Sequence, residues 1–286
     1  MDIQIIIALC EGPHDVAFLN KIFKTQGFVS NENSKLGDYP KPISDLLIKE
    51  AVKSNVEGLN IQEVRRNLLP ANTLVKDGVH ILFYVMGGDG KAERRKEFLK
   101  KILSIIIQPG EIRQGRVSHD IVLGMIYFFD ADTQGVMKRL ASVKREIGEI
   151  ITTITEDDFV YNGHFGFYEG IKLGAYIFSD QDNNIGKLEE DILLPIMKVD
   201  NDDIFKWADK FLDYFHDENR LFPLKLQITN ETIAENRSRS NKDRYKYDRS
   251  KSIIGAIGQL QQSGGSNTVC IGFTDYLTLD KIQNDR

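Results

Sequence analysis

The stretch IQIIIALCEGPHD, which runs from Ile3 to Asp15, decides how the chain begins to fold. Its first eight residues, Ile3–Cys10, form a continuous apolar run of the kind that becomes a strand buried on both faces of a parallel sheet. Gly12 and Pro13 break the run. Apolar residues then recur between Asp15 and Lys24 at the spacing of an amphipathic helix. The opening therefore predicts a strand, a loop and a helix, with Glu11 in the loop.

The same pattern occurs twice more. Val79–Met86 is a second apolar run, and the turn Gly87-Gly88-Asp89-Gly90 separates it from a helical pattern over Ala92–Ile107. A third run, Ile121–Phe129, ends in Asp130-Ala131-Asp132 and precedes a helical stripe from about 135 to 151. Three consecutive strand–helix units predict an α/β, Rossmann-like fold, with right-handed crossovers and a parallel sheet flanked by helices.

The remaining segments predict a core at 1–180 with an insertion at about 29–77, followed by a C-terminal α/β extension at 181–286. We expect the following elements outside the three units: a loop at Asn31–Pro42, helices at Ser44–Val52 and Ile61–Leu69, a fourth strand at Ala175–Ser179, helices at Gly186–Met197 and Asp203–His216, a serine-capped helix at Ser252–Gln262, and a last strand at Val269–Phe273.

Composition indicates a globular protein. The chain has 286 residues, of which 41% are apolar and 28% charged, and its net charge is -5. The sequence has no run of about 18 apolar residues, so it predicts no membrane span. The N-terminus lacks the basic region of a signal peptide. We expect a cytoplasmic protein in which Cys10 and Cys270 are buried, reduced thiols.

Carboxylates follow the predicted strands. In an open parallel sheet, ligands bind beyond the carboxyl ends of the strands. Glu11 follows the first strand, Gly87 and Gly88 follow the second, and Asp130 and Asp132 follow the third. Three carboxylates brought together repel one another unless they are protonated or neutralised by a cation. Hard oxygen ligands of this kind suit Mg²⁺ or Mn²⁺.

These residues carry a family resemblance. Glu11-Gly12-Pro13-His14-Asp15 resembles the EGxxD signature of Toprim domains, and Asp130-Ala131-Asp132 resembles their DxD signature. Gly87-Gly88 is similar to the small-residue turn that often follows the strand between them. The resemblance covers roughly residues 3 to 180 outside the insertion. The short opening, with Glu11 and Gly12 only about a dozen residues from the start, is most similar to the free-standing Toprim proteins or the nuclease-type members, such as the overcoming-lysogenization-defect nucleases.

The resemblance implies Mg²⁺-dependent (or Mn²⁺-dependent) hydrolysis of phosphodiester bonds in DNA or RNA, in phage defence or RNA processing. Asp130 and Asp132 would ligate the metal, and Glu11 would be either a ligand or the general acid/base. The metal would polarise a phosphoryl oxygen and activate a water. The sequence offers no tyrosine nucleophile, because Tyr127 lies in the middle of a predicted strand and belongs to the core. Gly12, Gly87, Gly88 and Lys91 would allow a phosphate to approach the backbone.

Other residues near these motifs have two readings each. Asp15 either caps the first helix or ligates, with capping favoured, and His14 is either a base or an ordinary loop histidine. Asp180 and Asp182 follow the fourth strand, where they either complete a second metal site or form a solvated turn. Glu189 and Glu190 lie at the start of a predicted helix, where acidic residues are favoured in any case.

A basic segment lies near the C-terminus, and we expect it to be a mobile loop. Its cations could neutralise phosphates and its tyrosines could stack on unpaired bases; the alternative is a solvated loop. The cations are Arg237, Arg239, Lys242, Arg244, Lys246, Arg249 and Lys251, and Tyr245 and Tyr247 lie between them.

Two other functions stay open. The chain could be a non-catalytic binding or regulatory module of a protein complex or a homodimer, in which the 29–77 insertion and the acidic segment Asp200–Glu218 are partner surfaces. It could also be a phosphotransfer domain in which Asp130 is itself phosphorylated. That reading leaves Glu11 and Gly12 without a role.

Overall fold

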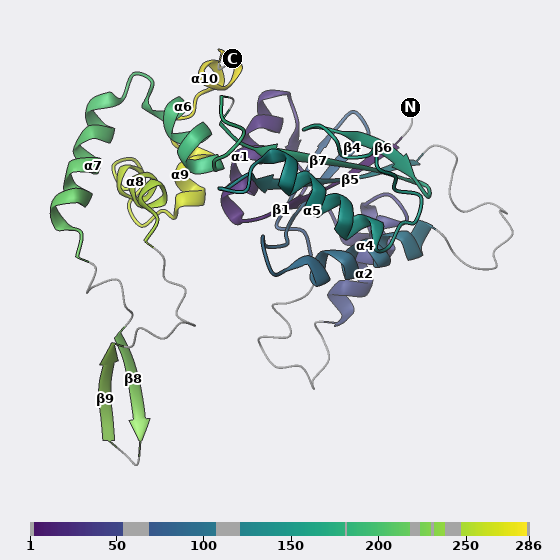
Figure 1. Ribbon diagram of the computed structural model, residues 1–286, viewed down its shortest axis with the longest axis horizontal. Coiled ribbons are helices and arrows are strands. Elements are labelled where there is room, and N and C mark those ends of the chain that lie inside the picture. The colour runs from purple at the N-terminus through teal and green to yellow at the C-terminus, as the bar shows by residue number, and fades with distance from the viewer. Residues whose placement is uncertain are drawn as a thin grey trace, which may run out of the picture. The chain divides into compact units, whose positions relative to one another are not determined.

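The computed structural model describes residues 3–53, 69–106, 121–180, 182–217, 224–229, 232–237 and 247–284. The chain divides into two compact units, Met1–Ile192 and Leu193–Arg286 (Figure 1). The helix predicted at Ile61–Leu69 falls almost entirely outside the described residues.

The first unit contains a seven-stranded sheet in the order β2-β3-β4-β1-β5-β7-β6. The four central strands, β4, β1, β5 and β7, are parallel, and antiparallel strands extend the sheet at both edges. The predicted α/β fold with a parallel sheet flanked by helices is therefore confirmed. The strands are β1 Ile3–Cys10, β2 Val29–Ser30, β3 Asn72–Lys76, β4 Val79–Val85, β5 Ile121–Asp130, β6 Phe165–Tyr168 and β7 Ile171–Phe178.

Helices cover both faces of this sheet. Helix α1 (Pro13–Thr25) lies on one face, where the Phe18 ring contacts that of Phe178 at the end of β7. Helices α2 (Ile43–Lys53), α4 (Ala92–Ile106) and α5 (Val136–Gly148) pack into one apolar cluster on the other face. The side chains of a strand alternate between the two faces. Neighbouring residues at a strand's end therefore point toward opposite helix layers.

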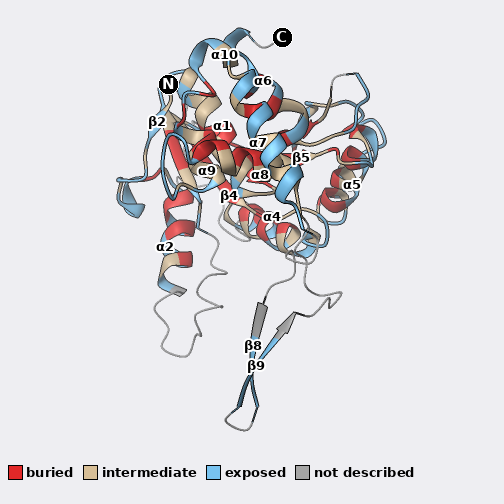
Figure 2. Cartoon of the chain, turned by 90° about the vertical axis from the view of Figure 1, so that its left-hand side faces the viewer, coloured by how far each residue is buried: buried red, intermediate tan, exposed pale blue. Residues whose placement is uncertain are grey.

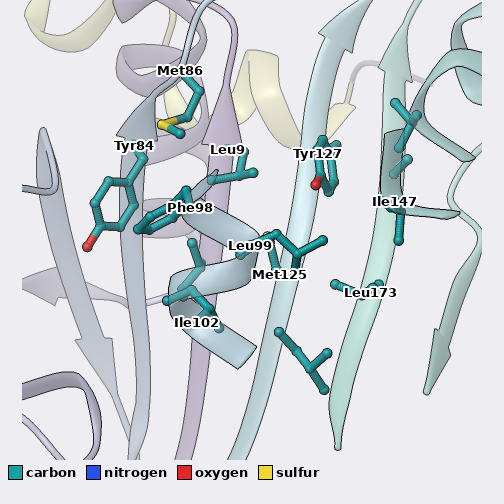
Figure 3. Packing of buried hydrophobic residues seen from close by; sticks show 14 of the residues in the cluster. Leu9, Tyr84, Met86, Phe98, Leu99, Ile102, Met125, Tyr127, Ile147 and Leu173 are labelled. Atoms are coloured by element: carbon teal, nitrogen blue, oxygen red, sulfur yellow. The ribbon is translucent and has the colours of Figure 1, made fainter. Parts of the chain in front are cut away.

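The apolar cluster is centred on α4 (Figure 3). Phe98, Leu99 and Ile102 are fully buried, and the Phe98 ring lies 4.7 Å from the ring of Tyr84 on β4. Tyr127 is also fully buried, as predicted from its place in the strand. Each such apolar side chain contributes about 1.5–3 kcal/mol when it is removed from water. This packing fixes the carboxyl ends of β1, β4 and β5 relative to one another.

The 29–77 insertion belongs to the sheet and the core. Its strands β2 and β3 extend one edge, and α2 buries Ile43 and Leu47 in the apolar cluster. Helix α2 confirms the helix predicted at Ser44–Val52. The two short strands were not predicted, because β2 has only two residues and β3 mixes polar and apolar side chains.

The second unit consists of short helices and one hairpin. Two predictions for it were wrong. Val269–Phe273 is helical, because Cys270 and Ile271 are buried in α9, which packs on α8; a five-residue apolar run does not distinguish strand from helix. The helix expected to start at Ser252 begins at Arg249, and its N-cap is Asp248. The elements are α6 Leu194–Lys198, α7 Asp202–Phe215, β8 Leu224–Thr229, β9 Thr232–Arg237, α8 Arg249–Gly258, α9 Asn267–Phe273 and α10 Leu279–Asn284.

The helix predicted over Gly186–Met197 is also different. Its first part is a π-helix, Leu188–Leu193, and α6 follows it. The change from π-helix to α-helix occurs directly before Pro195, which has no N–H to donate within a regular helix.

Figure 2 shows buried residues in helices of the first unit such as α2, α4 and α5, whereas the described part of the hairpin β8–β9 is pale blue. Cys10 and Cys270 are both buried, as predicted. The described side chains of β8 and β9 are exposed. Across the described ranges, no helix combines the length and apolar character needed to cross a membrane.

Candidate functional site at the carboxyl edge of the sheet

The sheet has a topological switch point between β1 and β5. From β1 the chain moves to β4 on one side, whereas from β5 it moves to β7 on the other side. The crevice between two such strands is where open α/β sheets bind ligands. Glu11 follows β1 directly and Asp130 is the last residue of β5. The fold therefore brings together two of the three acids that were predicted at this edge.

Glu11 lies against the turn that follows β4. The Gly87 amide donates to the Glu11 carbonyl at 3.1 Å, and a Cβ added to Gly88 would lie 1.8 Å from Glu11 Oε1. Only glycine fits at position 88 while the carboxylate holds this place. Gly87 has a φ of 79°, a left-handed conformation that also favours glycine.

The second carboxylate oxygen of Glu11 is buried and has no hydrogen-bond partner among the described residues. Burial raises the pKa of Glu11, and the nearby charges of Asp132 and Asp89 raise it further. Arg139 and the Asp130 backbone act in the opposite direction. A buried acceptor without a hydrogen bond destabilises the folded state, so binding of a proton or a cation at this oxygen is favourable.

Asp130 and Asp15 form the other half of the acidic cluster. Asp130 Oδ1 accepts the Leu188 amide at 2.9 Å, and burial raises the pKa of Asp130 to about 8, with Asp15, Glu189 and Glu11 adding to the effect. Asp15 accepts the Gly12 amide at 2.7 Å, which confirms the predicted capping role. Burial raises the pKa of Asp15 to about 7, and the Glu189 and Glu11 charges contribute.

Asp132 is held differently from the other acids. It has a φ of 49°, unusual for a residue with a side chain, and its backbone exchanges hydrogen bonds with Gly186 in both directions. Its Oδ2 accepts from Arg139 Nη2 at 2.7 Å, and Lys187 Nζ lies 4.0 Å from its Oδ1. Two cations therefore lie beside this carboxylate.

The chemistry of these donors fits a divalent cation. Carboxylate oxygens from Glu11, Asp130 and Asp132 are the hard ligands that Mg²⁺ and Mn²⁺ prefer, and the orphaned Glu11 oxygen gives such an ion a role. In the described parts of the chain, no three His, Cys, Asp or Glu side chains converge closely enough to hold an ion as they stand. Binding would therefore require these side chains to rotate toward a common point.

Two buried arginines support the edge and were missed in the sequence. Arg95 of α4 forms a two-point ion pair with Glu146 and donates to the carbonyls of Gly87 and Gly88. Arg139 of α5 contacts the Asp130 carbonyl and the carboxylates of Asp132 and Asp89. Both occur in helices full of charged residues, where nothing in the sequence separates a buried arginine from a solvated one. Asp89 was also missed, although it lies in the glycine-rich turn that follows β4 and so belongs to the same edge of the sheet.

The remaining predicted residues of this edge have local partners. His14 Nδ1 and Glu189 Oε1 lie 2.7 Å apart, and Glu189 is buried. Asp180 uses its carboxylate within its own turn, where Oδ1 accepts the Asp182 amide at 2.8 Å and Oδ2 accepts from Asn183. The side chains not brought into the cluster are the exposed ones of Lys91, Asp182 and Glu190.

Most of the basic segment lies outside the described residues. Arg239, Lys242, Arg244, Tyr245 and Lys246 lie outside the described residues, as does the side chain of Arg237. Arg249 forms ion pairs with Asp209 and Asp213 of α7, and Lys251 lies 3.8 Å from Asp248. The Tyr247 ring lies 4.2 Å from that of His216. Arg249 is therefore already neutralised by acids of its own unit.

Comparison with known proteins adds little to this geometry. No family model and no curated protein matches the chain. Among solved structures, the hypothetical protein PH0156 from Pyrococcus horikoshii OT3 is similar over 76% of this chain and 72% of that one, with 16% identity and a TM-score of 0.37. A likeness this distant carries no argument about the site, so the Toprim resemblance stays a prediction.

Proposed function

We propose that this protein is a Mg²⁺-dependent phosphodiester hydrolase of the Toprim type that acts on nucleic acid. One observation carries the proposal. Glu11 and Asp130 meet at the switch point of a parallel sheet, and Glu11 presents there a buried oxygen that has no partner among the described residues. Burial raises the pKa values of both acids, and the charges of neighbouring carboxylates add to the effect. A divalent cation would relieve this repulsion.

Each residue has a proposed role. Asp130 and Asp132 would hold the cation, and Glu11 would either join them or carry a proton at the scissile phosphate. The bound metal would supply Lewis-acid polarisation of a phosphoryl oxygen and an activated water. Water is the proposed nucleophile, because the Tyr127 hydroxyl is buried in the core, where no substrate reaches it. Gly87 and Gly88 would let a phosphate approach the backbone at the site.

The test is a cleavage assay. The purified protein would be incubated with single- and double-stranded DNA and RNA in Mg²⁺, in Mn²⁺ and in EDTA. We expect metal-dependent cleavage of one polymer that Glu11→Gln and Asp130→Asn each reduce by at least about 100-fold, the scale on which catalytic groups act. No cleavage of any polymer, or cleavage that both variants retain, contradicts the proposal.

One observation favours a second function, a binding module within a protein complex. Helix α7 exposes an aromatic stripe at helical spacing, formed by Trp207, Phe211, Tyr214 and Phe215. Exposed apolar patches mark surfaces for protein partners. Calorimetry with Mn²⁺ separates the two functions, because a module without catalysis has no need for a cation at the acidic edge.

The phosphotransfer alternative receives less support. A phosphate-accepting aspartate must be ionised and accessible to attack a phosphorus atom. Asp130 has a pKa raised to about 8 and an oxygen committed to the Leu188 amide. A raised pKa disfavours the ionised form in either role. The observation that separates the two is therefore the buried oxygen of Glu11 without a partner among the described residues, which a phosphotransfer site leaves without a role.

A further inference from the structure

Arg139 is a buried cation that contacts the acidic edge at three points. It projects from the first turns of α5, and its side chain is only 5% exposed. Its guanidinium group spans the loops that follow β4 and β5, the strands on either side of β1. Nη1 contacts Asp89 at 2.6 Å in the loop after β4, and Nη2 contacts Asp132 at 2.7 Å in the loop after β5.

A third contact fixes the arginine itself. Nε donates to the Asp130 carbonyl at 2.9 Å, so the side chain is anchored to the last residue of β5. Gln134 adds a further contact to Asp89, at 3.2 Å from its Oδ2. Asp89 is 69% exposed, and yet Arg139 of α5 and Gln134 of the loop before α5 hold it at the edge. The three contacts of Arg139 therefore join the loops on either side of Glu11.

The two carboxylate oxygens of Asp132 have different neighbours. Arg139 binds Oδ2, whereas Oδ1 lies 4.0 Å from Nζ of Lys187, whose side chain is 43% exposed. A long, exposed ion pair is weak, so Oδ1 is the oxygen that a cation could take without disturbing Arg139. The positive charge of Arg139 also lowers the pKa of Glu11, so its field reaches the central acid of the cluster.

We propose that Arg139 is the internal counter-ion and positioning residue of the metal site. It holds Asp132 and Asp89 at the edge and balances the acids until a divalent cation arrives. This inference rests on the proposed function, because it assumes that a cation binds there. In this proposal the divalent cation and Arg139 both neutralise the carboxylates of the acidic edge.

Arg95 provides a matched control. It is also a buried arginine on the same face of the sheet, and it supports the same β4–α4 loop through the carbonyls of Gly87 and Gly88. Its carboxylate partner is Glu146, which lies on α5 away from the acidic cluster. Replacing either arginine by methionine removes a buried cation, but only Arg139→Met exposes the candidate ligands to uncompensated repulsion.

The experiment measures the melting temperature by circular dichroism in EDTA and in Mn²⁺ for the wild type, Arg139→Met and Arg95→Met. We expect each variant to melt several degrees lower in EDTA. A bound cation stabilises the folded state by relieving repulsion among the carboxylates, and this repulsion is larger when Arg139 is missing. Mn²⁺ should therefore raise the melting temperature of Arg139→Met by at least about twice the wild-type shift. It should raise that of Arg95→Met by no more than the wild-type shift.

A double variant keeps the test decisive if Arg139→Met fails to fold. Arg139→Met combined with Asp132→Asn removes the acid together with its counter-ion, and we expect it to fold and to lose most of the Mn²⁺ response. Equal Mn²⁺ shifts in Arg139→Met and Arg95→Met, or a double variant that also fails to fold, overturn the counter-ion role. Absence of any Mn²⁺ shift or Mn²⁺ binding in the wild type instead overturns the proposed function itself.

Discussion

Asp130→Asn is the substitution with the clearest thermodynamic consequence. In the metal-free protein the pKa of Asp130 is raised to about 8 from an ordinary value of 3.8. The folded state therefore holds this proton more tightly than the unfolded state does. Stability from this group is greatest at low pH, and it is lost as the pH rises from about 4 toward 8.

The magnitude follows from the size of the shift. Within that window one carboxyl changes the unfolding free energy by up to about 1.4 kcal/mol per pH unit. Between pH 5 and pH 7 this amounts to on the order of 2–3 kcal/mol as an upper limit. Asparagine carries no charge, and its carbonyl still accepts the Leu188 amide that now binds Asp130 Oδ1. Asp130→Asn should therefore stabilise the metal-free protein at pH 7.5 by about 1–3 kcal/mol, and much less at pH 5.

The assay is urea unfolding in EDTA at both pH values. The single tryptophan, Trp207, belongs to the second unit, so its fluorescence does not report on the sheet. Far-UV circular dichroism or hydrogen exchange at the amides of β1 and β5 does. Asp182→Asn, which removes an exposed carboxylate from the turn after β7, is the control and should show no such pH effect. The reasoning is refuted if Asp130→Asn is less stable than the wild type at pH 7.5, or if the difference between them does not grow with pH.

Three further substitutions test the surroundings of the site. Gly88→Ala places a methyl group 1.8 Å from Glu11 Oε1, so it should displace this carboxylate and weaken Mn²⁺ binding, measured by calorimetry, at least about tenfold. Gly37→Ala is the control, because its methyl group meets open space and should leave Mn²⁺ affinity unchanged. Glu146→Gln breaks the buried pair with Arg95 and should lower the urea unfolding free energy by about 3–5 kcal/mol; a loss under about 1 kcal/mol contradicts the pair's role. Asp15→Asn removes a carboxyl whose pKa is raised to about 7 and should, like Asp130→Asn, flatten the fall in stability between pH 5 and 7 in EDTA; an unchanged slope argues against this burial.

The parallel core of the fold was predictable because its strands are buried on both faces. β1, β4 and β5 are continuous apolar runs, and each is followed by a loop and an amphipathic helix. The edge strand β6 lacked this signal. It has four residues, and half of them are exposed. The α9 error arose at a five-residue apolar run, whose length favours a strand, whereas the segment is a helix that buries Cys270 and Ile271 and packs on α8.

The candidate site was predictable in its acids but not in its cations. Glu11 and Asp130 follow strands, and the switch-point rule brings strand ends together without any knowledge of side chains. Arg139 and Arg95 depend on tertiary packing, which decides whether a helical arginine extends into solvent or turns inward. Asp180 shows the limit of the strand-end rule, because an aspartate in that position also satisfies a local turn.

The most direct test is anomalous diffraction from a crystal soaked in Mn²⁺. The account predicts one manganese peak beyond the carboxyl ends of β1 and β5, coordinated by Asp130, by Glu11 directly or through a water, and by Oδ1 of Asp132, with Arg139 still bound to Oδ2. No peak at this edge under saturating Mn²⁺, or a peak whose ligands exclude both Glu11 and Asp130, would contradict it.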